Sequence, residues 1–78
     1  MVLDIKIPNA EAVEKLGREV AKTPENIWVH SKEKGKIMVD ARSIMALYSL
    51  IGMDCYLVAE DDINPNLLEN IAKKSGVL

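Results

Sequence analysis

The hydrophobic pattern of the chain changes its period several times, and this alternation is the feature that most constrains the fold. Apolar residues at every second position predict strands at residues 2–7, 27–31, 36–41 and 53–59. Apolar residues at helical spacing predict helices at 10–22, 43–51 and 65–75. The resulting order is β-α-β-β-α-β-α, with long helical connections on both sides of a hairpin. This order predicts an α+β fold of two layers, with the helices on one face of an antiparallel sheet.

Residues that begin or end helices mark the same boundaries. Asn9 is expected to be an N-cap, and Pro24 ends the first helix because proline disfavours helical geometry in the residue before it. Gly52 is expected to close the second helix, Asn64 to cap the third and Gly76 to end it. None of these signals orders the strands within the sheet, so ferredoxin-like and ACT-like arrangements remain open at this point.

Length and charge exclude several classes of protein. Seventy-eight residues make one domain, residues 1–78, and a net charge of −2 provides no basic surface for nucleic acid. The chain has no apolar stretch of membrane-spanning length and no signal-peptide pattern, so we expect a cytoplasmic protein that binds no membrane. Cys55 is the only cysteine, which excludes an internal disulfide and favours a small buried apolar side chain.

The second predicted helix is too apolar to be covered by one sheet. It offers water only one hydroxyl and one phenol between residues 44 and 51. One face of this helix, with Leu47, Leu50 and Ile51, is expected to pack on the sheet. The other face, with Ile44, Met45 and Tyr48, then points outward. We expect a second protein to cover them. The alternative is that the C-terminal helix covers part of this surface.

Residues 39–50, VDARSIMALYSL, resemble HPr, the phosphocarrier protein family of the bacterial phosphoenolpyruvate-dependent sugar phosphotransferase system. In that family a strand ends in a basic residue and a serine, here Arg42 and Ser43, before Ile-Met and a small apolar helix. The sequence IKIPN at residues 5–9 is similar to the end of the family's first strand, and the element order agrees over nearly the whole chain. The resemblance implies an HPr-like open-faced sandwich with sheet order 1-4-2-3 and three helices on one side.

The site that carries phosphate in the HPr family is altered in this chain. The family motif Gly-x-His-x-Arg-Pro corresponds to residues 10–15, where Ala12 replaces the histidine and Glu14 replaces the arginine. Ala12 has no nucleophile, and Glu14 would repel the phosphoryl group that the arginine neutralises. His30, the only histidine, lies in the middle of a predicted strand and is expected to be solvated. Histidine-linked phosphotransfer is therefore not expected.

The resemblance points instead to Ser43 as a regulatory phosphorylation site. In Gram-positive members a dedicated kinase phosphorylates the serine that opens this helix, and the product binds a transcriptional regulator. A phosphate there would meet the amide N–H groups of the helix start and the adjacent Arg42. The alternative is that Ser43 is an N-cap that contributes ~1 kcal/mol and nothing else. The matching positions of the family dock partner proteins, which implies a docking surface of Arg42, Ile44, Met45 and Tyr48.

The face of the sheet that the helices leave bare should also carry apolar residues, namely Trp28, Met38, Tyr56 and Val58. In the order 1-4-2-3, we expect Trp28 to have Tyr56 or Val58 on one side and Met38 on the other. Burying roughly a few hundred Å² at ~25 cal/mol per Å² would favour a homodimer or a protein partner. The alternative is that charged residues cover this face and keep it solvated: Asp4, Lys6, Lys36 and Asp40.

These observations predict a non-catalytic HPr-like protein that binds or regulates partners, with phosphorylation of Ser43 as its switch. The alternative is a small oligomerisation or assembly module unrelated to phosphotransfer. The sequence has no metal-ligand motif, glycine-rich phosphate loop or nucleophile–base pair, so no catalysis, metal or cofactor is expected. Glu60, Asp61 and Asp62 lack the spacing of a calcium loop and are expected to form a solvated turn.

Overall fold

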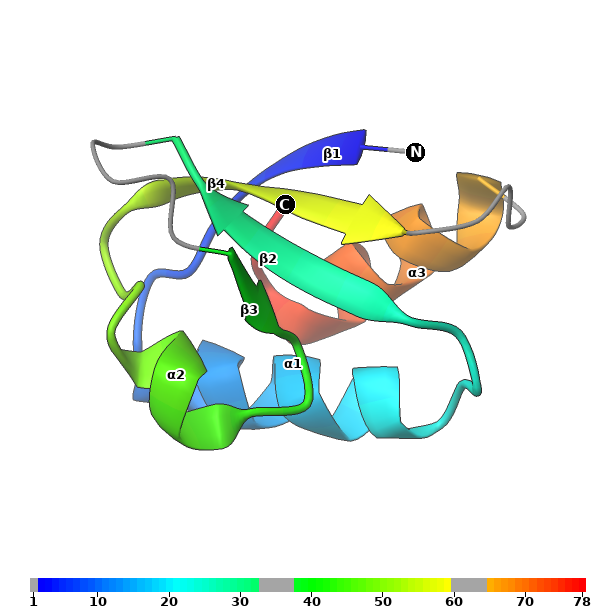
Figure 1. Ribbon diagram of the computed structural model, residues 1–78, viewed down its shortest axis with the longest axis horizontal. Coiled ribbons are helices and arrows are strands. Elements are labelled where there is room, and N and C mark those ends of the chain that lie inside the picture. The colour runs from blue at the N-terminus through cyan, green and yellow to red at the C-terminus, as the bar shows by residue number, and fades with distance from the viewer. Residues whose placement is uncertain (1, 33–37, 60–64) are drawn as a thin grey trace.

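The computed structural model describes residues 2–32, 38–59 and 65–78. These residues form β1 (Val2–Lys6), α1 (Ala10–Ala21), β2 (Ile27–Ser31), β3 (Met38–Asp40), α2 (Ile44–Tyr48), β4 (Asp54–Ala59) and α3 (Pro65–Ser75). The strands make one antiparallel sheet in the order β1-β4-β2-β3. This order confirms the expected α+β fold and excludes the ferredoxin-like and ACT-like arrangements. The three helices lie on one side of the sheet (Figure 1).

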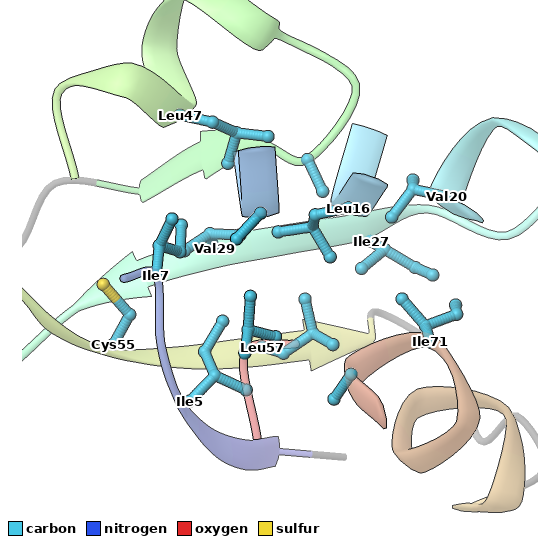
Figure 2. Packing of buried hydrophobic residues seen from close by; sticks show 14 of the residues in the cluster. Ile5, Ile7, Leu16, Val20, Ile27, Val29, Leu47, Cys55, Leu57 and Ile71 are labelled. Atoms are coloured by element: carbon cyan, nitrogen blue, oxygen red, sulfur yellow. The ribbon is translucent and has the colours of Figure 1, made fainter. Parts of the chain in front are cut away.

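One hydrophobic core fills the space between the sheet and the helices. Side chains from the sheet and from all three helices meet there (Figure 2). The alternation of the strands supplies one side of it and the helical stripe of α1 supplies the other, as the two periods in the sequence require. Its most deeply buried members include Ile7, Val13, Leu16, Val20, Ile27, Val29, Leu47, Leu57 and Leu68.

The described residues confirm two of the predicted helix boundaries. The Asn9 side chain accepts a hydrogen bond from the Ala12 N–H at 2.9 Å, which caps α1. Gly76 follows α3 with a φ of 73°, a conformation that suits glycine. Asn64, Lys36 and the acidic run Glu60, Asp61 and Asp62 lie outside the described residues.

The second helix is shorter than the sequence predicted, because α2 ends at Tyr48. The N–H groups of Ser49, Leu50 and Ile51 bond to carbonyls three residues earlier, at 3.2, 3.0 and 3.4 Å. The chain thus tightens into turns, which place Leu50 in the core. Gly52, with a φ of 85°, closes this connection instead of the helix, and its N–H donates to the Ile7 carbonyl at 2.8 Å.

Candidate functional site

The outer side of α2, with Arg42, Ile44, Met45 and Tyr48, forms what we call the α2 surface. Met45 is 83% exposed, Tyr48 39% and Ile44 36%, whereas Leu47 is fully buried beneath them. The short helix is thus held by one side and presents the other side to solvent, as the sequence predicted. Large apolar side chains gathered in this way make the α2 surface a candidate interaction surface.

Gly17 of α1 lets α2 approach closely. A Cβ atom added at Gly17 would lie 2.5 Å from the Cδ1 atom of Ile44, so the Ile44 side chain packs directly over the glycine. This contact fixes one edge of the α2 surface. No local sequence pattern predicts this contact, because it depends on how the two helices cross.

The guanidinium of Arg42, predicted to lie beside Ser43, already makes hydrogen bonds within the protein. Its Nη2 atom donates to the carbonyls of Thr23 and Glu25, at 2.7 and 2.9 Å. Its backbone N–H donates to an Asp40 side-chain oxygen at 2.9 Å. The guanidinium therefore ties the chain before α2 to the segment after α1. These contacts were not predictable from the sequence, since they join residues far apart in the chain.

Ser43 occupies the N-cap position of α2 but does not cap with its side chain. Its carbonyl accepts the Leu47 N–H at 3.0 Å, and its side chain makes no capping hydrogen bond. The alternative that Ser43 serves as a side-chain N-cap is therefore wrong. The residue is exposed, so its hydroxyl is accessible at the margin of the α2 surface.

The start of α1 lacks the features of a phosphoryl-transfer site. Ala12 is only 4% exposed, and its N–H is bonded to Asn9. Glu14 is exposed. Lys15 lines a shallow hollow of about 130 Å³ here, but it is paired with Glu11 at 3.0 Å. Position 12 thus presents a buried methyl group, and the nearby Lys15 is paired with a carboxylate of the same helix.

We call four residues on the bare side of the sheet the sheet-face patch: Trp28, Met38, Tyr56 and Val58. On β2 and β4 they alternate with buried residues, and on β3 Met38 precedes the half-buried Val39. Met38 is 58% exposed and the other three are half-buried. Trp28 lies between Val58 and Asp40, and Met38 pairs with His30. The expectation that Met38 lies directly beside Trp28 is therefore wrong. The register of β2 and β3, which hydrophobic alternation alone does not fix, decides this neighbour.

Lys32 covers part of the sheet face, a role that sequence reasoning missed. Its Nζ atom lies 4.7 Å from the centre of the Tyr56 ring and 3.0 Å from an Asp4 carboxylate oxygen. The hydrogen bond to Asp4 raises the pKa of Lys32. The sequence did contain a signal for this position: Lys32 follows Trp28 and His30 at intervals of two residues, and residues two apart in a strand share a face. The His30 ring lies 6.3 Å from the Tyr56 ring on the same face.

A hollow of about 410 Å³ at one end of β1 was also missed. It is lined by Lys6, Lys32, Asp4 and Asp54 together with the C-terminal residues Gly76 to Leu78. The Val77 carbonyl accepts the Lys6 N–H at 2.9 Å, which brings this segment to the edge of β1. Charges of both signs face the hollow, so it does not select an anion or a cation.

Cys55 is fully buried, and this burial raises the pKa of its thiol. The expectation of a small buried side chain is thus confirmed. Among the residues that the structure describes, no three His, Cys, Asp or Glu side chains gather so that they could hold a metal ion. No helix within the same ranges has the length and apolar character needed to cross a membrane.

No protein-family model matches the chain, and no curated protein shows significant sequence similarity to it.

Proposed function

We propose that this chain is a non-catalytic, HPr-like protein-binding module of the sugar phosphotransferase system type, which acts in the cytoplasm and docks its partner on the α2 surface. The observation that carries the proposal is the 83% exposure of Met45 between Ile44 and Tyr48. A methionine adapts to an irregular partner, and a tyrosine adds a large contact with a polar end. Ala12 and Glu14, at positions where phosphotransfer needs a histidine and an arginine, support a role without catalysis.

The α2 surface is already ordered before a partner binds. Leu47 anchors the helix in the core, Ile44 packs over Gly17, and Arg42 ties the preceding residues to Thr23 and Glu25. Because little ordering entropy remains to be lost, even a small apolar surface can bind usefully.

Phosphorylation of Ser43 is the proposed switch of this surface. A phosphate would add a charge of roughly −2 at the edge of the apolar side chains. It would also compete with the carbonyls of Thr23 and Glu25 for the guanidinium of the neighbouring Arg42. The added charge changes which partners the surface attracts. The competition for Arg42 loosens the segment around Thr23 and Glu25, which changes the shape that a partner meets.

The docking proposal is tested by site-specific photo-crosslinking of the full chain in an extract of its source cells. A photoreactive residue replaces Met45, and a matched control carries it at Glu69, an exposed position on α3. We expect a regulator, kinase or transporter domain to crosslink at position 45 and not at position 69. Equal crosslinking at both positions would contradict docking on α2.

The switch is tested separately with the HPr kinase and ATP, followed by mass spectrometry. We expect phosphate on Ser43 of the natural chain, also in a Ser49→Ala control, and none in Ser43→Ala. An unmodified Ser43 would contradict the proposed switch. It would not affect the docking proposal, which the crosslinking experiment tests.

A further inference from the structure

The two central strands of the sheet, β2 and β4, carry chemically matched residues on the bare face. We call each pair of residues that lie directly opposite each other on these strands a level. Val58 of β4 pairs with Trp28 of β2, and Tyr56 pairs with His30. At the next level the Lys32 N–H donates to the Asp54 carbonyl at 3.0 Å, and the side chains of these two residues have opposite charges. Along the strands, the first pair is therefore largely apolar, the second is a pair of rings and the third is charged.

We propose that a second copy of the chain packs on this face, related by a two-fold axis that runs parallel to the strands between β4 and β2. Such an axis places β4 of each copy over β2 of the other, as in aligned packing of two sheets. Val58 then faces Trp28 of the second copy, Tyr56 faces its His30, and Asp54 faces its Lys32. Each contact joins like chemistry or opposite charge.

An axis across the strands does not give this match. It would place the charged level of one copy over the apolar level of the other, so that Asp54 would face Val58. Burying a carboxylate against an apolar side chain is costly. The order of residues along the face thus selects one of the two symmetric arrangements.

The outer strands are matched less closely than the two central strands. Val2 on β1 is 59% exposed and Met38 on β3 is 58% exposed, at opposite edges of the sheet. The proposed axis puts β1 of one copy over β3 of the other, so that Val2 faces Asp40 and Asp4 faces Met38 of the second copy. These pairs lie at the rim of the contact, where a carboxylate keeps access to water, whereas the central strands hold the matched pairs. Lys32 already lies over Tyr56, close to the centre of the contact.

The size of the face predicts a weak dimer. Four strands about 4.8 Å apart, with an average length of about five residues at about 3.3 Å per residue, cover an area of roughly 300 Å². Stable dimers bury about 800 Å² per partner, so we expect association that depends on concentration. The contact lies on the opposite side of the sheet from α2, so it is independent of the docking function and leaves both α2 surfaces free.

The test is sedimentation equilibrium of the full chain. We expect mostly monomer at about 10 µM and mostly dimer at about 1 mM. Asp54→Lys and Lys32→Asp should each weaken association by about tenfold, because each homodimer would then oppose like charges twice. A 1:1 mixture of the two variants should associate again, since the mixed dimer restores both opposite-charge contacts.

Glu14→Lys and Lys74→Asp are the matched controls, since they change the net charge equally at exposed positions on α1 and α3. Both should associate like the natural chain. A natural chain that stays monomeric at about 1 mM would overturn the proposal and leave the face to a different protein or to solvent. A mixture of Asp54→Lys and Lys32→Asp that associates no better than either variant alone would also overturn it.

Discussion

At the scale of single residues, α2 assigns opposite roles to neighbours. Leu47 is fully buried, whereas Met45, two positions earlier, is 83% exposed. The sequence predicted this division, because even in a helix of five residues the residue spacing decides which side chains share a face. It did not predict that Arg42 would be held by the carbonyls of Thr23 and Glu25, since that contact needs the fold to bring the two segments together.

We expect Leu47→Ala to lower the free energy of unfolding by about 2–5 kcal/mol, because it removes the side chain that anchors α2 and leaves a cavity. Met45→Ala is the matched control and should change the free energy of unfolding by less than about 0.5 kcal/mol. Urea unfolding followed by circular dichroism measures both. If the two variants lose similar stability, Met45 is packed against the protein and the α2 surface is not free for docking.

At the scale of elements, the order of the elements was predictable and the register of the strands was not. The order of strands and helices was predictable from alternation and capping residues, such as Asn9 and Gly76, because these are local signals. On the bare face, the prediction of Tyr56 or Val58 beside Trp28 is confirmed by Val58, but the neighbour of Trp28 on β3 was not predictable, since the register of β3 against β2 sets Met38 opposite His30. Hydrophobic alternation decides which face of the sheet a residue lies on, but it leaves a shift of the register by two residues open.

Gly52 joins two elements with a backbone conformation that L-residues disfavour. Its φ is 85°, and a Cβ atom added there would meet nothing within 4 Å, so Gly52→Ala should cost about 1–2 kcal/mol through backbone strain alone. Gly76→Ala, at a φ of 73°, should behave similarly. D-alanine at position 52, introduced by chemical synthesis, should cause no such loss. Equal loss with D- and L-alanine would show that the position requires space and not a positive φ.

Lys32 joins β2 to β1 across β4. Its hydrogen bond to Asp4 raises its pKa, so Asp4→Asn should lower that pKa toward the ordinary value, as a side-chain NMR titration would show. Because the pKa is raised on folding, the stability from this pair is present in full below the unfolded value of about 10.4 and is lost as pH rises through the folded value. Asp40→Asn, on the same face, is the control. An unchanged pKa in Asp4→Asn would mean that the two side chains do not pair in solution.

At the scale of the whole molecule, strand order was the property least accessible from the sequence. Hydrophobic alternation identified four strands but could not order them, because pairing joins residues far apart in the chain. The resemblance of residues 39–50 to the HPr family supplied the order that the sheet has. Whether the α2 surface and the sheet face are used depends on partners, which neither periodicity nor burial identifies.

The position of Cys55 makes it a reporter of global unfolding. It is fully buried on β4, which lies between β1 and β2, and Ile5 and Ser31 are its direct neighbours on the two sides. A thiol reagent should therefore reach it only when the sheet separates, and fraying of α2 alone should not expose it. We expect native labelling to be slow, to accelerate with urea, and to be about 30-fold or more faster in Leu47→Ala, for a loss of about 2 kcal/mol or more. Unchanged labelling in a Leu47→Ala variant with a lower urea midpoint would show that Cys55 becomes accessible by a local opening of the sheet that does not depend on α2.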